Sequence, residues 1–233
     1  MAGNLYLVST PIGNMEDMTF RAVRTLQECD LIAAEDTRHT ALLLQRYDIH
    51  KPLESFHAYN EHNKVEKLIS RIQEGLNVAL VSDAGTPAVA DPGFLPLRAA
   101  LEAGLEPVII PGVSAVTFSV TASGLPVDRF AFWNFVPVKS GRKRKFFEEI
   151  AQCGYTVFCF ESPFRIENTL KLIAEVMPEA QVAVVREATK IHEEVIRGSA
   201  AELAKLQQRW RGEFVIGICN KPKRHSEEED SDS

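Results

Sequence analysis

The chain has 233 residues, of which 45% are hydrophobic and 25% are charged. These are ordinary values for a soluble protein, and the length suits one large domain or two small ones. No apolar run approaches the roughly 20 residues that span a bilayer, and the N-terminus lacks the basic segment of a signal peptide. The composition therefore argues against a membrane-spanning or secreted protein, and we expect a cytoplasmic one.

The net charge of −6 is unevenly distributed along the chain. Five acids lie between Ser226 and Ser233, and without them the remainder carries about −1. Residues 221–233 are predicted to form an acidic, disordered tail. By contrast, the segment KSGRKRK from Lys139 to Lys145 holds five positive side chains. This segment is either the solvated start of a helix or a seat for a phosphate backbone, and the pattern leaves both readings open.

The four cysteines are far apart and form no CxxC pair, and no His/Cys group has the spacing of a zinc site. We therefore expect reduced thiols and no structural metal.

The first half alternates apolar runs with amphipathic stretches, which predicts a mainly parallel sheet. Strands are expected at 5–9, 31–34, 52–56, 78–81 and 107–110, and helices at 19–28, 41–47, 60–74, 94–103 and 114–122. The last of these helices is apolar almost all round, so we expect it to be buried.

Gly124-Leu125-Pro126 interrupts this rhythm and predicts a domain boundary. After it, strands are expected at 130–135, 155–160, 182–186, 194–197 and 213–219, and helices at 142–151, 163–177 and 200–210. The predicted fold is thus two α/β domains, residues 1–123 and 124–220, with a ligand cleft between them.

Residues 82–93, SDAGTPAVADPG, form a long polar loop after a predicted buried strand. Most such connections hold about 2 to 6 residues, so this loop is either an unusually long link or a ligand loop. The loops at Pro11 and at Pro111 to Ala115 should lie beside it, because parallel strands end at one edge of the sheet. Neither GxGxxG nor GxxxxGK[ST] is present, which favours a small amino-acid-like or nucleoside-like ligand.

The segment EDTRHT, from Glu35 to Thr40, follows the second predicted strand. Asp36 or Thr37 could be a helix N-cap, the commonest reason for such residues at this position. Two acids, an arginine and a histidine within five residues could equally form a polar wall of a site.

Eight segments occur in the same order as in a known family: LYLVSTPIGNMEDMT, DLIAAEDTRHT, VALVSDAGTPAVADPG, IPGVSA, SGLPVDRF, ESPFR, REATKIHEE and RGEFV. Over residues 4–219 the chain resembles the bacterial small-subunit ribosomal RNA 2'-O-ribose methyltransferases of the tetrapyrrole-methylase superfamily. The resemblance implies two α/β domains, S-adenosylmethionine as cofactor, a homodimer, and a cytidine 2'-hydroxyl of 16S rRNA, free or in the small subunit, as acceptor.

By matching motif, the resemblance implies cofactor contacts at Pro11, Ile12, Asp83, Ala84, Gly85, Thr86, Val89, Ser114, Ala115, Phe160 and Val184. It implies that the walls of the catalytic site include Glu35, Asp36, Arg38, Glu187 and Lys190, with His192 a further candidate for the proton step. Contacts to RNA phosphates are expected from Lys139, Arg142, Lys143, Arg144, Lys145 and Arg165. For each charged residue alone, a surface ion pair is an equally good explanation.

The sequence departs from the family pattern at two places. Phe164 stands where ESPHR is usual, and Asn134 to Val138 replace a Gly-Phe-Leu-Pro-Arg-like segment. A rival reading keeps the fold and cofactor but methylates a tetrapyrrole or a modified histidine of a translation factor. A non-catalytic RNA-binding module is a third, for which a pI above about 9 would be expected, whereas the sequence pI is about 5.6.

Overall fold

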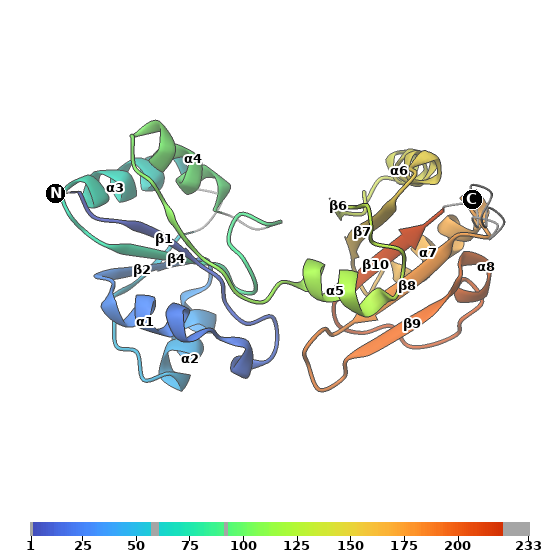
Figure 1. The fold of residues 1–233 in the computed structure, drawn as a ribbon, viewed down its shortest axis with the longest axis horizontal. Coiled ribbons are helices and arrows are strands. Elements are labelled where there is room, and N and C mark those ends of the chain that lie inside the picture. Colours follow the sequence, from blue (N-terminus) through green and yellow to red (C-terminus); the bar gives the residue numbers. More distant parts are fainter. Residues whose placement is uncertain (1, 57–60, 91–92, 221–233) are drawn as a thin grey trace, which may run out of the picture. The chain divides into compact units, whose positions relative to one another are not determined.

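The computed structural model describes residues 2–56, 61–90 and 93–220. The chain divides into two compact units, residues 1–115 and 116–233, each built on its own sheet (Figure 1). The sequence placed the boundary at Gly124 instead. The difference concerns helix α5 (Ala115–Ser123), whose last carbonyls, those of Ala122 and Ser123, accept hydrogen bonds from the guanidinium of Arg197 in the second unit. The predicted acidic tail, residues 221–233, lies outside the described residues.

The first unit has a five-stranded sheet in the order β3-β2-β4-β1-β5, and every pairing is parallel, as predicted. Its elements are β1 (Leu5–Val8), η1 (Met15–Asp17), α1 (Phe20–Glu28), β2 (Leu31–Ala34), α2 (Thr37–Arg46), β3 (Leu53–Ser55), α3 (Glu61–Gln73), β4 (Val78–Val81), α4 (Phe94–Glu102) and β5 (Val108–Ile110).

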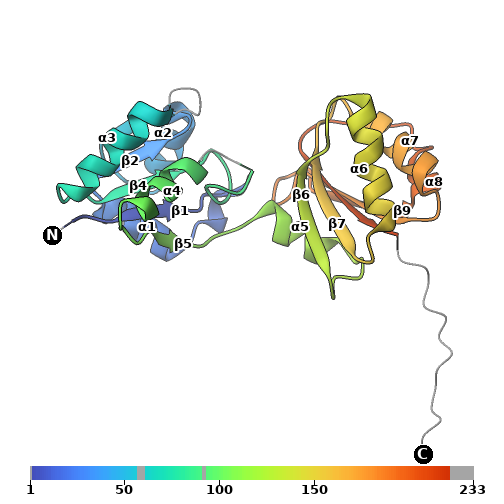
Figure 2. The same ribbon diagram turned by 90° about the horizontal axis from the view of Figure 1, so that it is seen from above.

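The central strands of this sheet are buried on both faces. All four residues of β2 and of β4 are buried, which explains why these segments are continuous apolar runs rather than alternating ones. Helices α1 and α2 supply one apolar cluster, and α3 and α4 supply the other, on opposite faces of the sheet (Figure 1). Figure 2 shows the same elements from above. Loops after the strands are thereby left at one edge.

The second unit has a mixed sheet in the order β6-β7-β10-β8-β9, in which only β6 and β7 pair in parallel. Its elements after α5 are β6 (Phe130–Phe135), α6 (Ser140–Gln152), β7 (Thr156–Glu161), α7 (Ile166–Val176), β8 (Gln181–Arg186), β9 (Glu194–Ser199), α8 (Ala200–Leu203) and β10 (Phe214–Cys219).

Two helix predictions for the later part of the chain were wrong in detail. The helix expected at 200–210 ends at Leu203. Trp210, which was expected to close that helix, packs its ring on Phe214, with 5.6 Å between the ring centroids. Helix α5, expected to be buried, buries only Ser119 and Ser123. Its sequence has no charged residue that would mark an exposed face, so periodicity could not reveal one.

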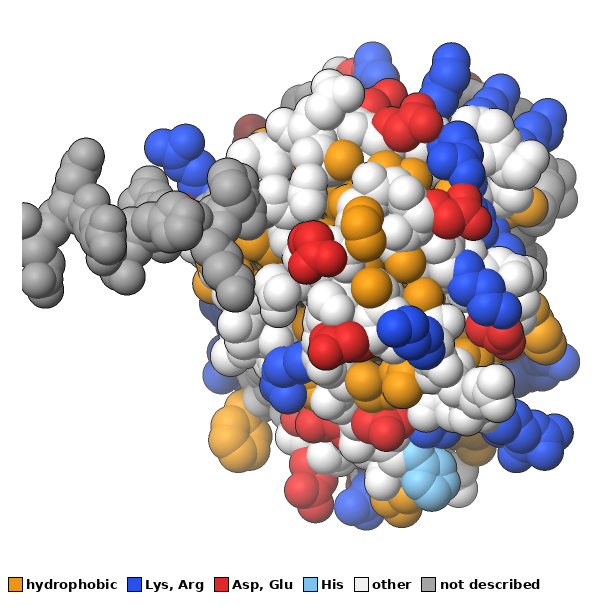
Figure 3. Space-filling model, turned by 90° about the vertical axis from the view of Figure 1, so that its right-hand side faces the viewer, with side chains coloured by type: hydrophobic (Ala, Val, Ile, Leu, Met, Phe, Trp, Pro, Cys, Tyr) orange, Lys and Arg blue, Asp and Glu red, His pale blue; other side chains and the backbone are white. Residues whose placement is uncertain are grey.

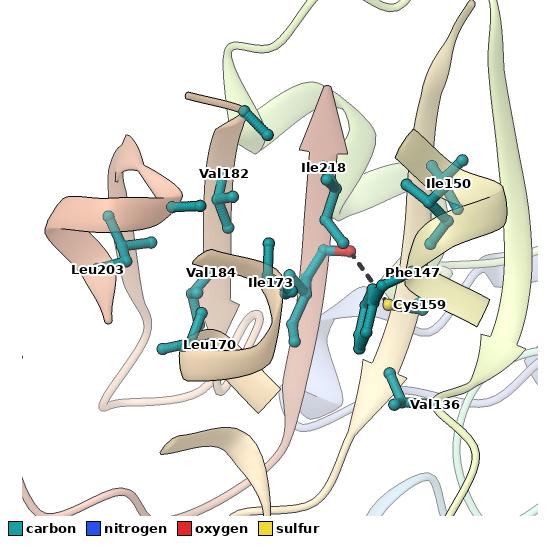
Figure 4. Packing of buried hydrophobic residues seen from close by; sticks show 14 of the residues in the cluster. Val136, Phe147, Ile150, Cys159, Leu170, Ile173, Val182, Val184, Leu203 and Ile218 are labelled. Atoms are coloured by element: carbon teal, nitrogen blue, oxygen red, sulfur yellow. Dashed lines mark hydrogen bonds between the residues drawn. The ribbon is translucent and has the colours of Figure 1, made fainter. Parts of the chain in front are cut away.

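The core of the second unit joins α6, α7 and α8 to the strands (Figure 4). Phe147 and Ile173 are fully buried within it. The Cys159 thiol donates a hydrogen bond to the carbonyl of Ile216 at 3.8 Å, and burial raises the pKa of this thiol. All four cysteines are free, and three of them are buried, which confirms the reduced thiols expected from the sequence.

A buried carboxylate, that of Glu161 at the end of β7, ties three elements of the second unit together. Its side chain has no exposure and accepts hydrogen bonds from the Thr169 hydroxyl at 2.5 Å and the Ser162 amide at 2.7 Å. The Arg165 guanidinium lies 2.7 Å from one carboxylate oxygen of Glu161, and the Lys143 ammonium lies 3.7 Å from the other. A buried charge is tolerated only with such partners, so this cluster fixes α6 and α7 against β7.

We expect Glu161→Ala to lower the free energy of unfolding by about 3–5 kcal/mol, because it leaves two cations without their buried counter-charge. Chemical denaturation followed by tryptophan fluorescence measures this directly, since both tryptophans, Trp133 and Trp210, belong to the second unit. The control is Glu167→Ala, which removes only the exposed pair with Lys171 and should cost about 0.5 kcal/mol or less. Equal losses in the two variants would contradict a special role for Glu161.

Candidate functional site

Two loops of the first unit are joined by backbone hydrogen bonds at the carboxyl edge of its sheet. Thr10, just after β1, and Gly85, after β4, exchange amide-to-carbonyl bonds of 2.9 and 3.1 Å. Beside this bridge, the hydroxyl oxygens of Ser9 and Thr86 lie 3.0 Å apart. The loop at Pro11 and the loop at 82–93 therefore form one continuous structure.

The third loop, after β5, packs against the same place. The amide of Ser9 donates to the carbonyl of Ile110 at 3.1 Å. A Cβ added to Gly112 would lie 2.8 Å from the Cβ of Ser9, which is too close for any side chain. Glycine is thus required for the close approach, and the clustering of three loops that the sequence predicted is observed.

The described part of the 82–93 loop has an unusual backbone conformation. Gly85 has φ 82°, and two non-glycine residues, Ala88 and Ala90, have φ 73° and 63°. The left-handed region costs an L-residue about 1–2 kcal/mol, so surrounding contacts must hold the loop in this shape. Such strain is concentrated at ligand and active sites. The loop offers backbone and small side chains to a ligand, since Ala84 and Val89 are exposed.

The EDTRHT segment reaches this loop through Asp36. Its amide donates to Oδ1 of Asp83 at 3.0 Å, while its carboxylate accepts from the Arg38 amide at 2.8 Å and so caps α2. The Arg38 guanidinium bonds the same carboxylate at 2.8 Å and holds the pKa of Asp36 well below its usual range. Asp36 is therefore both the N-cap and part of the site edge, with half-buried Glu35 beside it.

In the second unit, the REATK segment forms a compact ion cluster. The Lys190 ammonium bonds the carboxylates of Glu187 at 3.0 Å and Glu213 at 2.8 Å. Burial raises the pKa of Glu187, but the Glu213 amide and Lys190 outweigh it, so this pKa is lowered overall. Burial lowers the pKa of Lys190, but the two carboxylates outweigh it and raise it. At neutral pH Lys190 is consequently a cation.

Backbone strain occurs in this cluster too. Glu187 has φ 49° and Thr189 has φ 64°, and the Thr189 hydroxyl is buried with no hydrogen-bond partner among the described residues. His192, the further candidate for the proton step, is exposed at the end of this segment.

The two cofactor candidates of the second unit differ in their surroundings. Phe160 is half-buried and packs its ring on those of Phe132 and Phe135, with centroids 4.9 and 5.1 Å apart. Val184 lies in the middle of β8 with its side chain fully buried in the core. This burial argues against a ligand contact through the Val184 side chain.

The expected basic patch contains fewer free cations than its sequence suggests. Lys143 is only 8% exposed, and its ammonium donates to the Thr169 hydroxyl at 3.0 Å. The predicted contact of Lys143 with RNA was therefore wrong, and this side chain belongs to the core. Phe147, two residues after this segment, is also buried. Arg144 pairs with Glu175 at 2.6 Å, and Arg165 pairs with the buried Glu161.

Four cations of this segment are exposed in the structure, Lys139, Arg142, Arg144 and Lys145, and Arg144 is the one paired with Glu175. The face of the second unit drawn in Figure 3 shows Lys and Arg side chains interspersed with Asp and Glu side chains. On the face drawn in Figure 3, a contact with a phosphate backbone would rest on individual cations rather than on a field of one sign.

A pocket that the sequence did not predict lies in the first unit, between the end of β3 and α3. Its volume is about 130 Å³, and its lining comprises Ala33, Glu54, Ser55, Phe56, Lys64, Lys67, Leu68 and Arg71. The available signal was the recurrence of basic residues at 64, 67 and 71, a spacing that places them on one face of a helix. Among the described residues, no group of His, Cys, Asp and Glu side chains is arranged to hold a metal ion.

The architecture of this chain is that of a known protein family. The chain belongs to the tetrapyrrole (corrin/porphyrin) methylases, whose family model matches residues 4–204. Two relatives are named ribosomal RNA small subunit methyltransferase I. That of Synechocystis is 46% identical over 93% of this chain and 79% of its own length. That of Halalkalibacterium halodurans is 42% identical over 92% and 75% respectively.

Solved structures share the fold at lower identity. Diphthine synthase matches with a TM-score of 0.69 and 16% identity, covering 93% of this chain and 90% of that one. Uroporphyrin-III C-methyltransferase from Thermus thermophilus, complexed with S-adenyl homocysteine, matches with a TM-score of 0.61 and 22% identity, covering 92% and 97%. No helix within the described residues is long and apolar enough to cross a membrane.

Because the pKa of Glu187 is lowered in the folded protein, we expect this residue to contribute a pH-dependent stabilisation of the fold. A carboxylate with a depressed folded-state pKa stabilises the fold above its unfolded pKa of about 4.3, and this stabilisation disappears as the pH falls further. We expect Glu187→Gln to melt at a lower temperature than the wild-type protein at pH 7, with the gap closing below about pH 4. Thermal melts across this range measure it. Glu179→Gln, which changes an exposed acid of the same unit, should show no such pH-dependent gap, and a constant gap for Glu187→Gln would refute the linkage.

Proposed function

We propose that this protein is a methyltransferase that uses S-adenosylmethionine to methylate the ribose 2'-hydroxyl of a cytidine in 16S rRNA. The main support for this proposal is the sequence identity of 42–46% with relatives named ribosomal RNA small subunit methyltransferase I, over more than nine-tenths of this chain. The family of methylases to which the chain belongs supports the reaction class.

The three joined loops of the first unit fit such a cofactor. Gly85 and Gly112 keep the loops free of side chains where they meet, and Thr86 presents a hydroxyl bonded to Ser9. Backbone groups and small side chains suit a zwitterionic amino-acid part and a nucleoside better than they suit a phosphate chain. The residues that would hold the cofactor here are Pro11, Ile12, Asp83, Ala84, Gly85, Thr86, Val89, Ser114 and Ala115. When bound, the cofactor supplies an electrophilic methyl group on a sulfonium.

The ionisation of the candidate side chains favours alignment over strong base catalysis. Asp36 and Glu187 have lowered pKa values, which makes their carboxylates weak bases. Lys190 is cationic at neutral pH because its pKa is raised, so it is suited to polarise a hydroxyl or hold an anion. Positioning of the acceptor oxygen therefore contributes more to the rate than proton removal does.

The acceptor is held by exposed cations in this proposal. The Arg38 guanidinium is 90% exposed even while bonded to Asp36, so it keeps donors for an RNA phosphate. Lys139, Arg142 and Lys145 are exposed on the second unit. Arginine and lysine contacts to phosphates position an RNA without reading its sequence.

We further propose that the enzyme acts as a homodimer in the cytoplasm, where its rRNA substrate is made. Support for a dimer comes from exposed apolar side chains on edge strands, Ile109 of β5 at 49% and Phe130 of β6 at 45%. The apolar α5, only partly buried within one chain, supports it as well, because exposed apolar patches commonly mark interfaces.

The proposed cofactor site is tested by Thr86→Arg. A long cationic side chain at the junction of the loops should fill the site and repel a sulfonium, so we expect calorimetry to detect no binding of S-adenosylmethionine. The matched control is Gln27→Arg on the exposed side of α1, which adds the same side chain and should bind normally. Unchanged affinity in Thr86→Arg would place the site elsewhere.

The proposed acceptor is tested by transfer of a labelled methyl group. We expect label to enter small ribosomal subunits or 16S rRNA, and the product nucleoside to be a 2'-O-methylcytidine. A tetrapyrrole and a translation factor serve as competing acceptors, because proteins of this fold include methyltransferases for uroporphyrin. Label in either of these and none in RNA would replace the proposed function.

A further inference from the structure

The pocket between β3 and α3 has the composition of an anion site. Lys64, Lys67 and Arg71 line one side of it, and Glu54 is the only acid in its lining. The lining thus carries three positive charges against one negative charge. Its volume of about 130 Å³ far exceeds the roughly 10–15 Å³ that one water needs, so a group of several non-hydrogen atoms fits.

The three cations are crowded by the geometry of α3. Positions 64, 67 and 71 are three and four residues apart, which aligns their side chains along one stripe of the helix. Like charges at this spacing destabilise a helix. Arg71 is compensated, because its guanidinium donates to both oxygens of Glu54 at 2.9 and 2.8 Å. The other two cations have no carboxylate partner among the described residues.

Donors in the pocket are left over after these contacts. The Lys64 ammonium donates to the Ser55 carbonyl at 3.0 Å and has two further N–H bonds to give. Lys67 is exposed. The Ser55 hydroxyl is buried with no hydrogen-bond partner among the described residues. A buried hydroxyl without a hydrogen bond costs about 1–3 kcal/mol of stability. One anion between these groups would satisfy all three.

The pocket lies on the same edge of the sheet as the candidate site. Ser55 ends β3, which pairs in parallel with β2, and the Phe56 amide donates to the Ala34 carbonyl at 2.7 Å. Glu35 and Asp36 follow Ala34 directly. Neighbouring strands are about 4.8 Å apart, and β3 is three places from β1 in the sheet, so the pocket is roughly 15 Å from the loop that follows β1.

From this arrangement we propose that the β3–α3 pocket binds a backbone phosphate of the substrate RNA, near the methylated nucleotide. The inference rests on the proposed rRNA function. Ammonium and hydroxyl donors around an anion-sized hollow match a phosphate. The contact positions the strand and reads no base.

The test compares two doubly substituted proteins with the same change of charge. Lys64→Gln/Lys67→Gln removes the two uncompensated cations of the pocket, and Arg21→Gln/Arg24→Gln removes two exposed cations from α1 on the other face of the sheet. Affinity for the RNA or subunit that the wild-type protein methylates is measured at roughly 50 to 300 mM salt, because the salt dependence of affinity reports the number of phosphate contacts.

The pocket variant should bind RNA about tenfold more weakly, and the slope of log affinity against log salt should fall by about 0.7, the contribution of one single-strand phosphate contact. The α1 variant should change neither quantity by as much, and S-adenosylmethionine affinity should be unchanged in both. Equal losses in the two variants, or an unchanged slope in the pocket variant, would overturn the inference while leaving the proposed function intact. A wild-type protein that binds and methylates no RNA would overturn both.

Ser55→Ala separates an anion site from a merely structural hollow. If the hydroxyl serves a phosphate, this variant should lose about threefold in RNA affinity while its melting temperature without RNA stays equal or rises, because an unsatisfied buried group is removed. A lower melting temperature with unchanged RNA affinity would contradict the proposal. Binding of inorganic phosphate without any effect of the three substitutions on RNA would identify an adventitious ion site.

Discussion

The parallel pairing of the first sheet is the constraint on which the candidate site depends. With the order β3-β2-β4-β1-β5, the five strands, which are far apart in sequence, all end at one edge. The Thr10–Gly85 bridge then fixes two of their loops to each other, and Gly112 allows the third to touch Ser9. Because these contacts are made mainly by backbone, the loops can hold conformations, such as those of Ala88 and Ala90, that isolated chains avoid.

Charge is used in three different ways within this chain, and only burial distinguishes them. Glu161 is buried and acts as the centre of a structural network. Glu187 and Lys190 are half-buried and fix each other's ionisation, so that one remains an anion and the other a cation. Lys67 is exposed beside the β3–α3 pocket, with no carboxylate partner in the part of the chain that the structure describes. The same residue types therefore form a buried network, a half-buried ion cluster, or an exposed cation beside a pocket.

Much of the fold follows from local pattern. The strands at 31–34, 78–81 and 130–135 match the structure residue for residue. The first two are apolar runs with a polar residue on each side. The predicted loop cluster followed from strand direction alone. Predictions were weakest where a segment had no pattern of its own, as in α5, whose exposed face carries no charge, and after Leu203, where the helix ends and Trp210 packs on Phe214.

By itself, the sequence determined the two α/β units, the edge where the loops meet and, through its ordered motifs, the resemblance to methylases that the family match confirms. Only the tertiary structure decided what individual side chains do there. KSGRKRK lists five cations, but helical periodicity turns Lys143 into the core, where Glu161 neutralises it. The pocket at Ser55 likewise needs β3 and α3 to be packed together, because its lining comes from separate elements. Local pattern specifies elements and their direction, whereas burial and partnership are properties of the packed whole.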